Sequence, residues 1–358
     1  MRVSIITFHC SYNYGSVLQA YALQEAVRNL VDEVAIIDYR SRDFNQYHII
    51  RPLRPWKIPR SLLNLDGLTR RKHAFNVFFE RFFQLTENRY SYLNERKLLG
   101  LQGRFDAFIC GSDQIWNLDC TGGAIEPFFL SFAGDKRRIA YAPSLAHTSF
   151  RPDYFDKGKV ASLLSRFDFL SVREEETLPL FQPLVDKKIE VALDPTLLLG
   201  AEAYRDMVGE RVQDAPYIFI YLLRECPELV KSAAEMSEAS KMKVYYISER
   251  DLPIPGAVNL FGAGPEEFVS LIAHAGAVLT NSFHATVFSI LFRKPFRVYA
   301  TDLSASRMRG LLASLDILER CVDEADAGPI ASVDWGDVEL RLDRLRAGSW
   351  AYLREALA

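Results

Sequence analysis

The sequence predicts an α/β protein built from two doubly wound domains that face each other across a cleft. Short apolar runs alternate with amphipathic helical stretches, which is typical of parallel sheets covered by helices. This alternation starts a second time after about residue 215 of the 358 residues, and one domain per ~150 residues also gives two domains. Because such folds bind ligands at the carboxyl ends of their strands, the site is expected in the cleft.

The first domain is expected to cover residues 1–198. Val3–Phe8 has the pattern of a buried strand, and apolar residues three or four apart between Val17 and Leu30 predict the helix that follows. A basic and aromatic helical insertion is expected at about residues 48–100. Further strands are expected at Val34–Ile37, Ala107–Cys110, Arg138–Tyr141, Phe169–Val172 and Ile189–Leu193.

The second domain is expected at residues 199–335, followed by an amphipathic helix at residues 336–358. Gly264-Pro265-Glu266-Glu267 marks a helix start, because proline takes the first helical position and the acids lie in the first turn. Strands are expected at Tyr217–Tyr221, Lys243–Ile247, Ala277–Thr280 and Phe296–Tyr299, and helices at residues 228–240 and 283–292.

The overall composition excludes several classes of protein. Forty-three basic and 46 acidic residues leave a net charge of −3, so no whole-chain charge favours a nucleic-acid backbone. Five cysteines, without a Cys-x-x-Cys pair, argue against a disulfide framework or a zinc ribbon. No leader peptide and no run of ~20 apolar residues is present. We therefore expect a cytoplasmic protein.

The motif Thr280-Asn281-Ser282-Phe283-His284 directly follows an expected strand and opens a helix. Ser282 can cap that helix, and the N–H groups of its first turn favour an anion. Asn281, Ser282 and Phe283 are therefore candidate anion contacts, and His284 is the candidate catalytic residue. The positive helix end favours a neutral imidazole, whereas a bound dianion favours the protonated ring. The alternative is a histidine satisfied by a backbone carbonyl in a packed turn.

A second motif, Gly111-Ser112-Asp113-Gln114, lies at the end of the expected strand Ala107–Cys110. Gly111 permits a close approach to a ligand, and Asp113 could accept a hydroxyl proton or bind a sugar. Ser112 and Gln114 belong to the same candidate site. The alternative is a capping turn in which Ser112 or Asp113 satisfies its own backbone.

The loop after the first strand contains Asn13-Tyr14-Gly15, which resembles a ligand-binding loop by position. It lacks both the Gly-x-Gly-x-x-Gly fingerprint of dinucleotide folds and the Gly-Lys-Ser/Thr phosphate loop. These three residues are therefore candidate contacts on their position alone.

Arg173 directly follows the expected strand Phe169–Val172. An arginine at this place can hold a carboxylate or phosphate through two hydrogen bonds, and the alternative is a salt bridge to Glu176 or a neighbour. Asp194, after the last strand of the domain, is interpreted as part of a structural turn. No set of His, Cys and carboxylate residues has metal-ligand spacing, and no Asp-x-Asp pair is present. We therefore expect metal-independent chemistry.

Residues 51–83 combine eight basic residues with several aromatic ones, against only Asp66 and Glu80. A basic amphipathic segment can rest on an anionic membrane surface. The alternative is a helical insertion that packs its aromatic rings on its own domain.

Taken together, these motifs resemble the polysaccharide pyruvyl transferase family. The resemblance spans about residues 1–315, with the motifs in the same order. The matching segments are Thr7-Phe8-His9, Asn13-Tyr14-Gly15-Ser16-Val17-Leu18-Gln19-Ala20, Cys110-Gly111-Ser112-Asp113-Gln114-Ile115-Trp116-Asn117, Ser171-Val172-Arg173-Glu174, Leu193-Asp194-Pro195-Thr196 and Thr280-Asn281-Ser282-Phe283-His284.

The resemblance implies two Rossmann-like domains of the GT-B type. It also implies transfer of pyruvate from phosphoenolpyruvate onto two hydroxyls of a sugar as a cyclic ketal, in the synthesis of a bacterial surface or exported polysaccharide. Phosphoenolpyruvate is then a co-substrate and no cofactor is expected. The acceptor is a sugar, with a lipid-linked oligosaccharide as one form, and this is where contact of residues 51–83 with a membrane would serve.

The family pattern also implies roles for particular residues. Arg173 matches a donor-contacting arginine, and His284 matches the catalytic candidate, with Asp113 as the candidate base. The family's arginine two positions before the histidine is replaced here by Ser282, and the glycine that often follows it by Ala285. Arg307 or Arg309 could supply the missing donor-site charge.

Two other functions are compatible with the same residues. The first is a nucleotide-sugar glycosyltransferase on the same architecture, and the second is a non-catalytic saccharide-binding relative. Release of inorganic phosphate, of a nucleotide, or of neither distinguishes the three.

Overall fold

The computed structural model describes residues 1–41, 64–123, 125–145, 156–300 and 305–358. Its chain forms two compact units, and we describe each by itself. The first unit holds the described residues within Met1–Pro55, Phe79–Leu199 and Arg344–Ala358. The second holds those within Trp56–Phe78 and Gly200–Asp343. The cleft expected between the domains stays a prediction.

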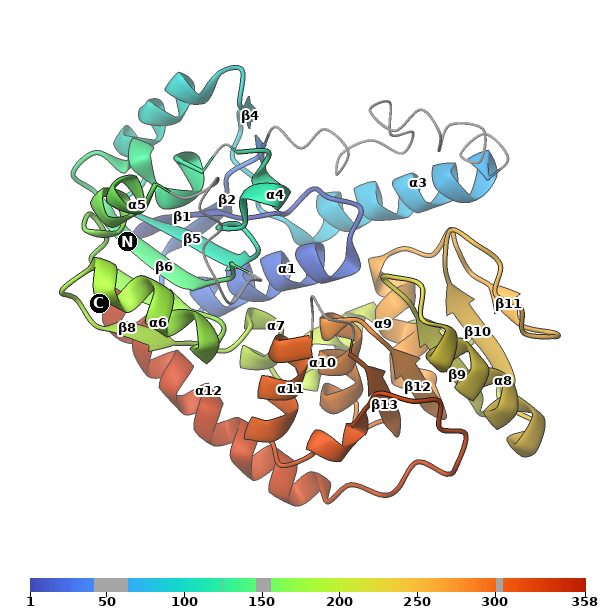
Figure 1. Cartoon of the computed structure of the whole chain (residues 1–358). Helices are drawn as coiled ribbons and strands as arrows, with labels where there is room; N and C mark the ends of the chain where they lie inside the picture. Colours follow the sequence, from blue (N-terminus) through green and yellow to red (C-terminus); the bar gives the residue numbers. More distant parts are fainter. Residues whose placement is uncertain (42–63, 124, 146–155, 301–304) are drawn as a thin grey trace. The chain divides into compact units, whose positions relative to one another are not determined.

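A six-stranded, fully parallel sheet forms the centre of the first unit (Figure 1). Its strand order is β2-β1-β5-β6-β7-β8, so the order of winding reverses between β1 and β5. In open α/β sheets, such a reversal opens the crevice in which ligands bind. The strands are β1 (Arg2–Ile6), β2 (Glu33–Ile36), β5 (Ala107–Asp113), β6 (Arg137–Pro143), β7 (Phe169–Val172) and β8 (Ile189–Val191); β3 (Tyr39–Arg40) and β4 (Tyr90–Ser91) pair separately.

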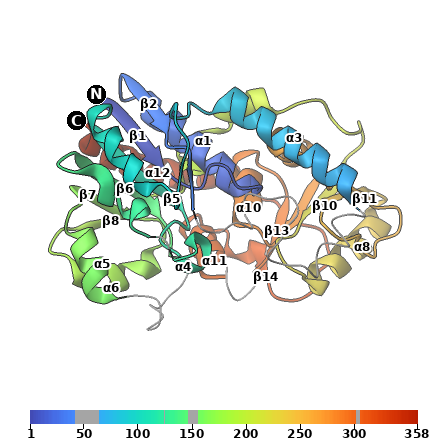
Figure 2. The same ribbon diagram turned by 90° about the horizontal axis from the view of Figure 1, so that it is seen from above.

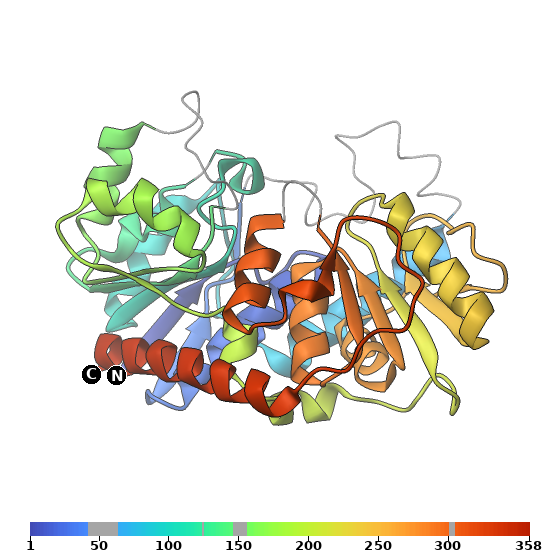
Figure 3. The same ribbon diagram turned by 60° about the horizontal axis from the view of Figure 1, so that its bottom comes forward.

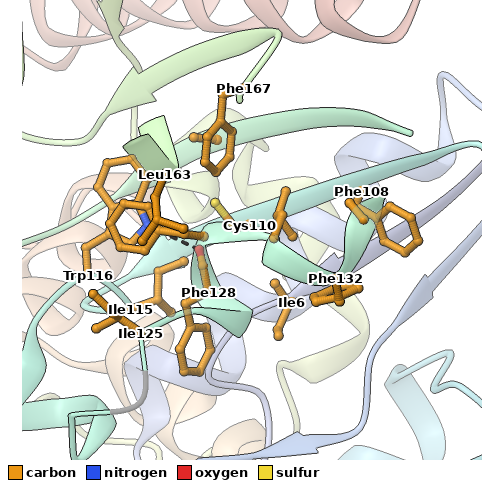
Figure 4. Packing of buried hydrophobic residues seen from close by; sticks show 14 of the residues in the cluster. Ile6, Phe108, Cys110, Ile115, Trp116, Ile125, Phe128, Phe132, Leu163 and Phe167 are labelled. Carbon is orange, nitrogen blue, oxygen red and sulfur yellow. Dashed lines mark hydrogen bonds between the residues drawn. The ribbon is translucent and has the colours of Figure 1, made fainter. Parts of the chain in front are cut away.

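Helices cover both faces of this sheet. On one face lie α1 (Tyr14–Arg28), α7 (Pro195–Leu198) and the end of α12 (Trp335–Leu357), where Tyr352 packs against Tyr141. The opposite face packs against α5 (Lys157–Leu164) and α6 (Leu178–Phe181). There Trp116 stacks on Phe129 and donates its indole N–H to the Phe128 carbonyl, and Cys110 lies among these apolar side chains (Figure 4).

The second unit repeats this architecture with another six-stranded parallel sheet. Its order, β11-β10-β9-β12-β13-β14, is 3-2-1-4-5-6 when counted along the unit, which is the Rossmann order with its switch point between β9 and β12. The strands are β9 (Tyr217–Tyr221), β10 (Lys243–Ile247), β11 (Val258–Asn259), β12 (Ala277–Thr280), β13 (Phe296–Tyr299) and β14 (Cys321–Val322).

Alternate residues of β9 bury opposite faces of the second sheet. Ile218 and Ile220 pack with α8 (Pro227–Ser240), whereas Phe219 and Tyr221 contact Phe268 of α9 (Pro265–His274). Phe268 in turn contacts Phe288 of α10 (Phe283–Leu291), which runs beside β12 and β13 (Figure 3). The alternation expected from the sequence therefore describes both sheets.

The insertion after β3 differs in part from the expectation. Residues 48–63 of the expected insertion lie outside the described residues, and α3 (Leu65–Phe82) follows them. The part of α3 up to Phe78 belongs to the second unit, not to the first domain as expected. A Cβ on Gly264 would lie 2.5 Å from the Cβ of Ala74, and Arg70 pairs with Glu267 at 2.5 Å, so this helix packs closely on the start of α9.

Two rings in the described part of the basic aromatic segment lie inside the protein. Phe75 and Phe78 are fully buried, and the guanidinium of Arg71 lies over the rings of Phe75 and Phe261. Packed rings are what the alternative for residues 51–83 expects, but up to Phe78 they belong to the second unit and not to the first domain. Residues 51–63 are outside the described part, and contact with a membrane stays a prediction. No described helix is both long enough and apolar enough to cross a membrane.

Both ends of the chain lie side by side in the first unit (Figure 2). Arg137 of β6 donates hydrogen bonds to the carbonyls of Ala356 and Ala358 at the end of α12. The remaining helices are α4 (Leu118–Thr121), α11 (Ala305–Ser314) and short 3-10 helices at Glu95–Gly103, Pro127–Phe129, Ser131–Ala133, Glu175–Thr177, Gln182–Leu184, Ala201–Met207 and Leu318–Arg320.

Candidate functional site

The switch point of the first unit is held by a hydrogen-bond network between β1, α1 and β5. Gln19 of α1 donates to the Thr7 hydroxyl at 2.9 Å and accepts from the Ser112 N–H at 3.1 Å. Thr7 donates to the Ser112 carbonyl at 3.1 Å. Thr7 and Gln19 were not predicted as site residues, although both lie in segments that carry the family resemblance. Their polar side chains next to the end of β1 were the available signal.

Asp113 ends β5 as a buried and firmly held carboxylate. Its Oδ2 accepts from the Ser16 hydroxyl at 2.6 Å and its Oδ1 from the Gln114 N–H at 2.8 Å. Its φ of 70° lies in the left-handed region, which Asp adopts more readily than most residues. Each carboxylate oxygen can accept a second hydrogen bond, so these two bonds leave room for a substrate hydroxyl. The expected role of Asp113 as the base stays a prediction.

Three other predicted acceptor residues serve the internal structure. Gly111 has a φ of 123°, and a Cβ there would lie 2.0 Å from the Tyr141 carbonyl, so the neighbouring strand requires this glycine. Ser112 is fully buried and donates to the Ala142 carbonyl at 2.5 Å. Tyr14 is also fully buried. Contact of these three residues with an acceptor stays a prediction.

The remaining predicted acceptor residues lie at the edge of the network. Asn13 is exposed and caps α1 by accepting from the N–H groups of Gly15 and Ser16 at 2.9 and 3.3 Å. Gln114 is partly exposed and accepts from Asn117 at 3.0 Å. Asn13 and Gln114 are thus the predicted side chains of this group that reach the surface, while Gly15 is buried in the first turn.

Arg173 lies at the end of β7 inside a buried ion-pair network. Its Nε donates to Glu174 and its Nη1 to Asp194, both at 2.8 Å. Burial alone would lower the pKa of Arg173. The negative charges of Glu174, Asp194 and Asp113 outweigh this effect, and the pKa is raised above its ordinary value. The salt bridge stated as the alternative is therefore present, to Glu174 rather than Glu176. Donor binding by Arg173 stays a prediction, and the charge of this arginine is already compensated.

Asp194 does more than form a turn into the linker. Its Oδ1 accepts from both the N–H and the hydroxyl of Thr196, at 3.0 and 2.5 Å, and thereby caps α7. Its other oxygen binds Arg173. The carboxylate thus connects the ends of β7 and β8.

At the switch point of the second unit, Asn281 connects the loops after β12 and β9. Its Oδ1 accepts from the Leu223 N–H at 2.8 Å, and its Nδ2 donates to the Arg224 carbonyl at 3.0 Å. Thr280 donates to the Tyr221 carbonyl at 2.6 Å. In this structure the Asn281 amide therefore positions the two loops, and its expected donor contact stays a prediction.

The motif after β12 forms the helix start that the sequence predicts. Ser282 is the N-cap of α10 and accepts from the Ala285 N–H at 3.4 Å. His284 lies in the first turn and is partly exposed, with the mostly buried Phe283 ring edge-on to it at 5.3 Å. An imidazole in the first turn of a helix lies beside the N–H groups that favour anions.

Of the two candidate replacement charges, Arg309 is engaged elsewhere. It forms a salt bridge of 2.5 Å with Asp323, just after β14. Arg307 lies on α11, which is joined to α10 by the contact of the Thr286 hydroxyl with the Met308 sulfur at 4.0 Å. Arg307 therefore stays the candidate donor-site arginine.

A further group of polar residues was not predicted as a unit. Among the residues that the structure describes, ligand-type atoms of His9, Cys10 and Asp38 lie within 4.8 Å of one another, all buried. Asp38 follows β2, the strand next to β1, so only the strand order brings it to His9. Arg89 and Arg40 approach the same carboxylate, at 2.9 and 3.7 Å.

The fold defined by these two sheets also occurs in solved structures. The UDP-GlcNAc 2-epimerase of Neisseria meningitidis, solved with UDP-GlcNAc bound, is similar over 100% of this chain and 94% of its own, with a TM-score of 0.53 and 10% identity. The corresponding epimerase of Methanocaldococcus jannaschii is similar over 96% and 92%, with a TM-score of 0.52 and 12% identity. The chain thus has the two-domain, Rossmann-like fold of GT-B type enzymes.

A family model assigns the chain within this fold. The model described as polysaccharide pyruvyl transferase matches residues 13–302. The chain belongs to the polysaccharide pyruvyl transferase family and is accordingly a transferase enzyme with a sugar or polysaccharide acceptor. No curated protein matches the sequence.

Proposed function

We propose that this enzyme transfers pyruvate from phosphoenolpyruvate to two hydroxyls of a sugar, forming a cyclic ketal and releasing phosphate. The observation that carries this proposal is the position of His284, partly exposed in the first turn of α10 at a Rossmann switch point. Phosphoenolpyruvate is a multiply charged anion, and a helix N-terminus favours such a group without a metal ion. The polysaccharide built in this way belongs to the bacterial cell surface or is exported.

Each proton in the proposed reaction has a destination. His284, as an imidazolium, protonates the methylene carbon of phosphoenolpyruvate, which becomes a methyl group. The first sugar hydroxyl attacks the central carbon and the second closes the ketal as the bond to phosphate breaks. One hydroxyl proton replaces the proton that His284 gave, and the other leaves with the phosphate. Asp113 is the proposed base for one hydroxyl, and general acid–base catalysis supplies about 10²–10⁴-fold of rate.

Phosphate release tests the reaction directly. The purified enzyme is incubated with phosphoenolpyruvate and a nitrophenyl or lipid-linked sugar, and inorganic phosphate and the ketal are measured. Phosphate formed only when both substrates are present supports the proposal. Release of a nucleotide from a nucleotide sugar identifies a glycosyltransferase instead, and neither product identifies a saccharide-binding protein.

The His284→Ala variant tests the residue assignment. We expect turnover to fall about 10²-fold or more because the acid is lost, while the midpoint of urea unfolding stays near that of the wild type. His73→Ala is the matched control, because His73 is an exposed histidine of α3. Phosphate release by His284→Ala at the rate of the control would remove His284 from the mechanism.

A further inference from the structure

Three buried carboxylates surround Arg173 at the carboxyl ends of the first sheet. Arg173 forms ion pairs with Glu174 and Asp194, each at 2.8 Å, and its charge interacts with that of Asp113. The side chains of Glu174 and Asp194 are 7% and 0% exposed. Because three carboxylates share one guanidinium, this group suits a ligand that donates hydrogen bonds better than one that carries negative charge.

In two of these carboxylates, every oxygen accepts a hydrogen bond from the protein. Asp194 accepts from the N–H and hydroxyl of Thr196 at Oδ1 and from Arg173 at Oδ2. Asp113 accepts from the Ser16 hydroxyl at Oδ2 and from a backbone N–H at Oδ1. The fold itself therefore accounts for the burial of these two groups.

Glu174 differs from both because only one of its two oxygens is used. Its Oε1 accepts from Arg173 Nε and from the Ser144 hydroxyl, both at 2.8 Å. Its Oε2 is buried and meets no donor within the part of the chain that the structure describes. Buried carboxylate oxygens are normally hydrogen-bonded, so an unused one indicates a donor that does not belong to the chain.

Hydrogen bonds between strand ends hold Glu174 near Asp113. The Ser144 N–H donates to the Asp113 carbonyl at 2.8 Å, while the Ser144 hydroxyl binds Glu174. The Arg173 N–H donates to the Pro143 carbonyl at 3.3 Å. The ends of β5, β6 and β7 are thereby joined, and Glu174 lies at the same edge of the sheet as the proposed base. This is the edge at which α/β folds bind ligands.

We propose that Glu174 binds the sugar acceptor, its Oε2 accepting a hydrogen bond from one sugar hydroxyl while Asp113 contacts another. Assigning the hydroxyl to the acceptor rests on the proposed function, in which two hydroxyls of one sugar have to be held together. Hydrogen bonds to a charged carboxylate are among the stronger ones, so they orient a hydroxyl well. This bond transfers no proton to Glu174, and the proton balance of the reaction is unchanged. Arg173 is then a positioning residue, which holds the carboxylate.

Saturation-transfer NMR on the full chain tests this residue without phosphoenolpyruvate. The nitrophenyl β-glycosides of glucose, galactose and mannose are the three probes, and the Kd of each is measured. We expect at least one probe to bind, and Glu174→Gln to weaken that binding about tenfold because a hydrogen bond to a charged group is lost. Asp194→Asn is the matched control, since it removes a carboxylate from the same arginine, but one whose oxygens already accept from the protein.

The control separates sugar binding from a purely structural role of Glu174. Both variants break a buried ion pair and should lower the midpoint of urea unfolding, but only Glu174→Gln should weaken sugar binding. Glu174→Asp, which keeps the charge and withdraws the oxygens, takes its place if Glu174→Gln does not fold.

Three results would overturn the proposal. They are no binding of any probe by the wild type, equal affinities in the wild type and Glu174→Gln, and an equal loss of affinity in Glu174→Gln and Asp194→Asn. Because binding is measured without turnover, a lack of phosphate release would refute the proposed function and leave this result unaffected.

Discussion

At the scale of single residues, position 111 shows how a sheet constrains its own strand ends. Gly111 has a φ of 123°, and an added Cβ would approach the Tyr141 carbonyl to 2.0 Å. We expect Gly111→Ala to lower the free energy of unfolding by about 3 kcal/mol or more, because strain and overpacking add. Urea unfolding checks this, with Gly100→Ala as the control since nothing lies within 4 Å of that position. Equal midpoints for the two variants would contradict the role given to Gly111.

His9 is the residue at which stability should depend on alkaline pH. Burial alone would lower its pKa, but its interactions with Cys10 and Asp38 outweigh this and raise the pKa from 6.5 to about 10. The stabilisation is therefore complete below about pH 6.5 and is lost as the pH rises through about 10. Burial alone would raise the pKa of Asp38, but His9 and Arg89 lower it well below its usual range. The contribution of Asp38 is thus lost only in strong acid.

The prediction concerns the difference between two pH profiles. Between neutral pH and about pH 10, the free energy of unfolding of the wild type should fall more steeply than that of His9→Gln, which carries no titratable group there. Urea unfolding across this range measures both profiles. Parallel profiles would show that His9 is neutral in the folded protein, and Asp38→Asn provides a second variant if His9→Gln does not fold.

At the scale of elements, Arg173 connects the ends of β7 and β8 through its carboxylate partners. Its side chain is 3% exposed, and removing it leaves Glu174 and Asp194 buried without their cation. We expect Arg173→Gln to lower the free energy of unfolding by about 3–5 kcal/mol, the usual cost of breaking a buried ion pair. Arg166→Gln, at an exposed arginine just before β7, should change it by about 0.5 kcal/mol or less.

This measurement separates a structural from a purely ligand-binding arginine. A residue used only for the donor would lose activity on substitution while the unfolding midpoint stayed at that of Arg166→Gln. Activity is therefore measured on the fraction that is folded at the assay temperature. Loss of activity without loss of stability would contradict the ion-pair role.

The elements themselves were largely predictable because apolar periodicity reports local burial. Runs such as Tyr217–Tyr221 and Ala277–Thr280 are strands with the expected bounds. The two-residue strands β3, β4, β11 and β14 carry too few residues for a periodic signal. The partners of α3 could not be predicted either, because Ala74 meets Gly264 only through the tertiary fold.

The residues of the candidate site that directly follow a strand could be predicted from the sequence. Ser282 and His284 were placed correctly at a helix start, because a capping serine directly after an apolar strand is a local signal. The internal roles of Gly111 and Ser112 depend on the neighbouring strand, which one segment of sequence does not specify. Asp38 escaped prediction for the same reason, since its partner His9 lies 29 positions away.

At the scale of the whole molecule, the chain does not divide into two units at one position. Residues Arg344–Ala358 return to the first unit, although Gly200–Asp343 belong to the second. The Tyr352 hydroxyl donates to the Ala140 carbonyl at 2.8 Å, and Ser349 accepts from the Leu193 N–H at 3.0 Å. The end of α12 is therefore part of the packing of the first sheet, and a fragment that stops at Leu199 lacks it.

Deleting Arg344–Ala358 should thus destabilise the first unit selectively. The deletion removes the buried side chains of Leu353 and Leu357, and each large apolar side chain contributes about 1.5–3 kcal/mol. Hydrogen exchange followed by mass spectrometry should show lost protection in β6 and β8, whereas β9 and β12 keep theirs, because no residue of the second unit is deleted. Tyr352→Phe is the milder comparison, since it removes one hydrogen bond and retains the ring. Equal loss of protection in both units would mean that their stabilities are coupled, and unchanged protection in β6 would contradict the packing role of α12.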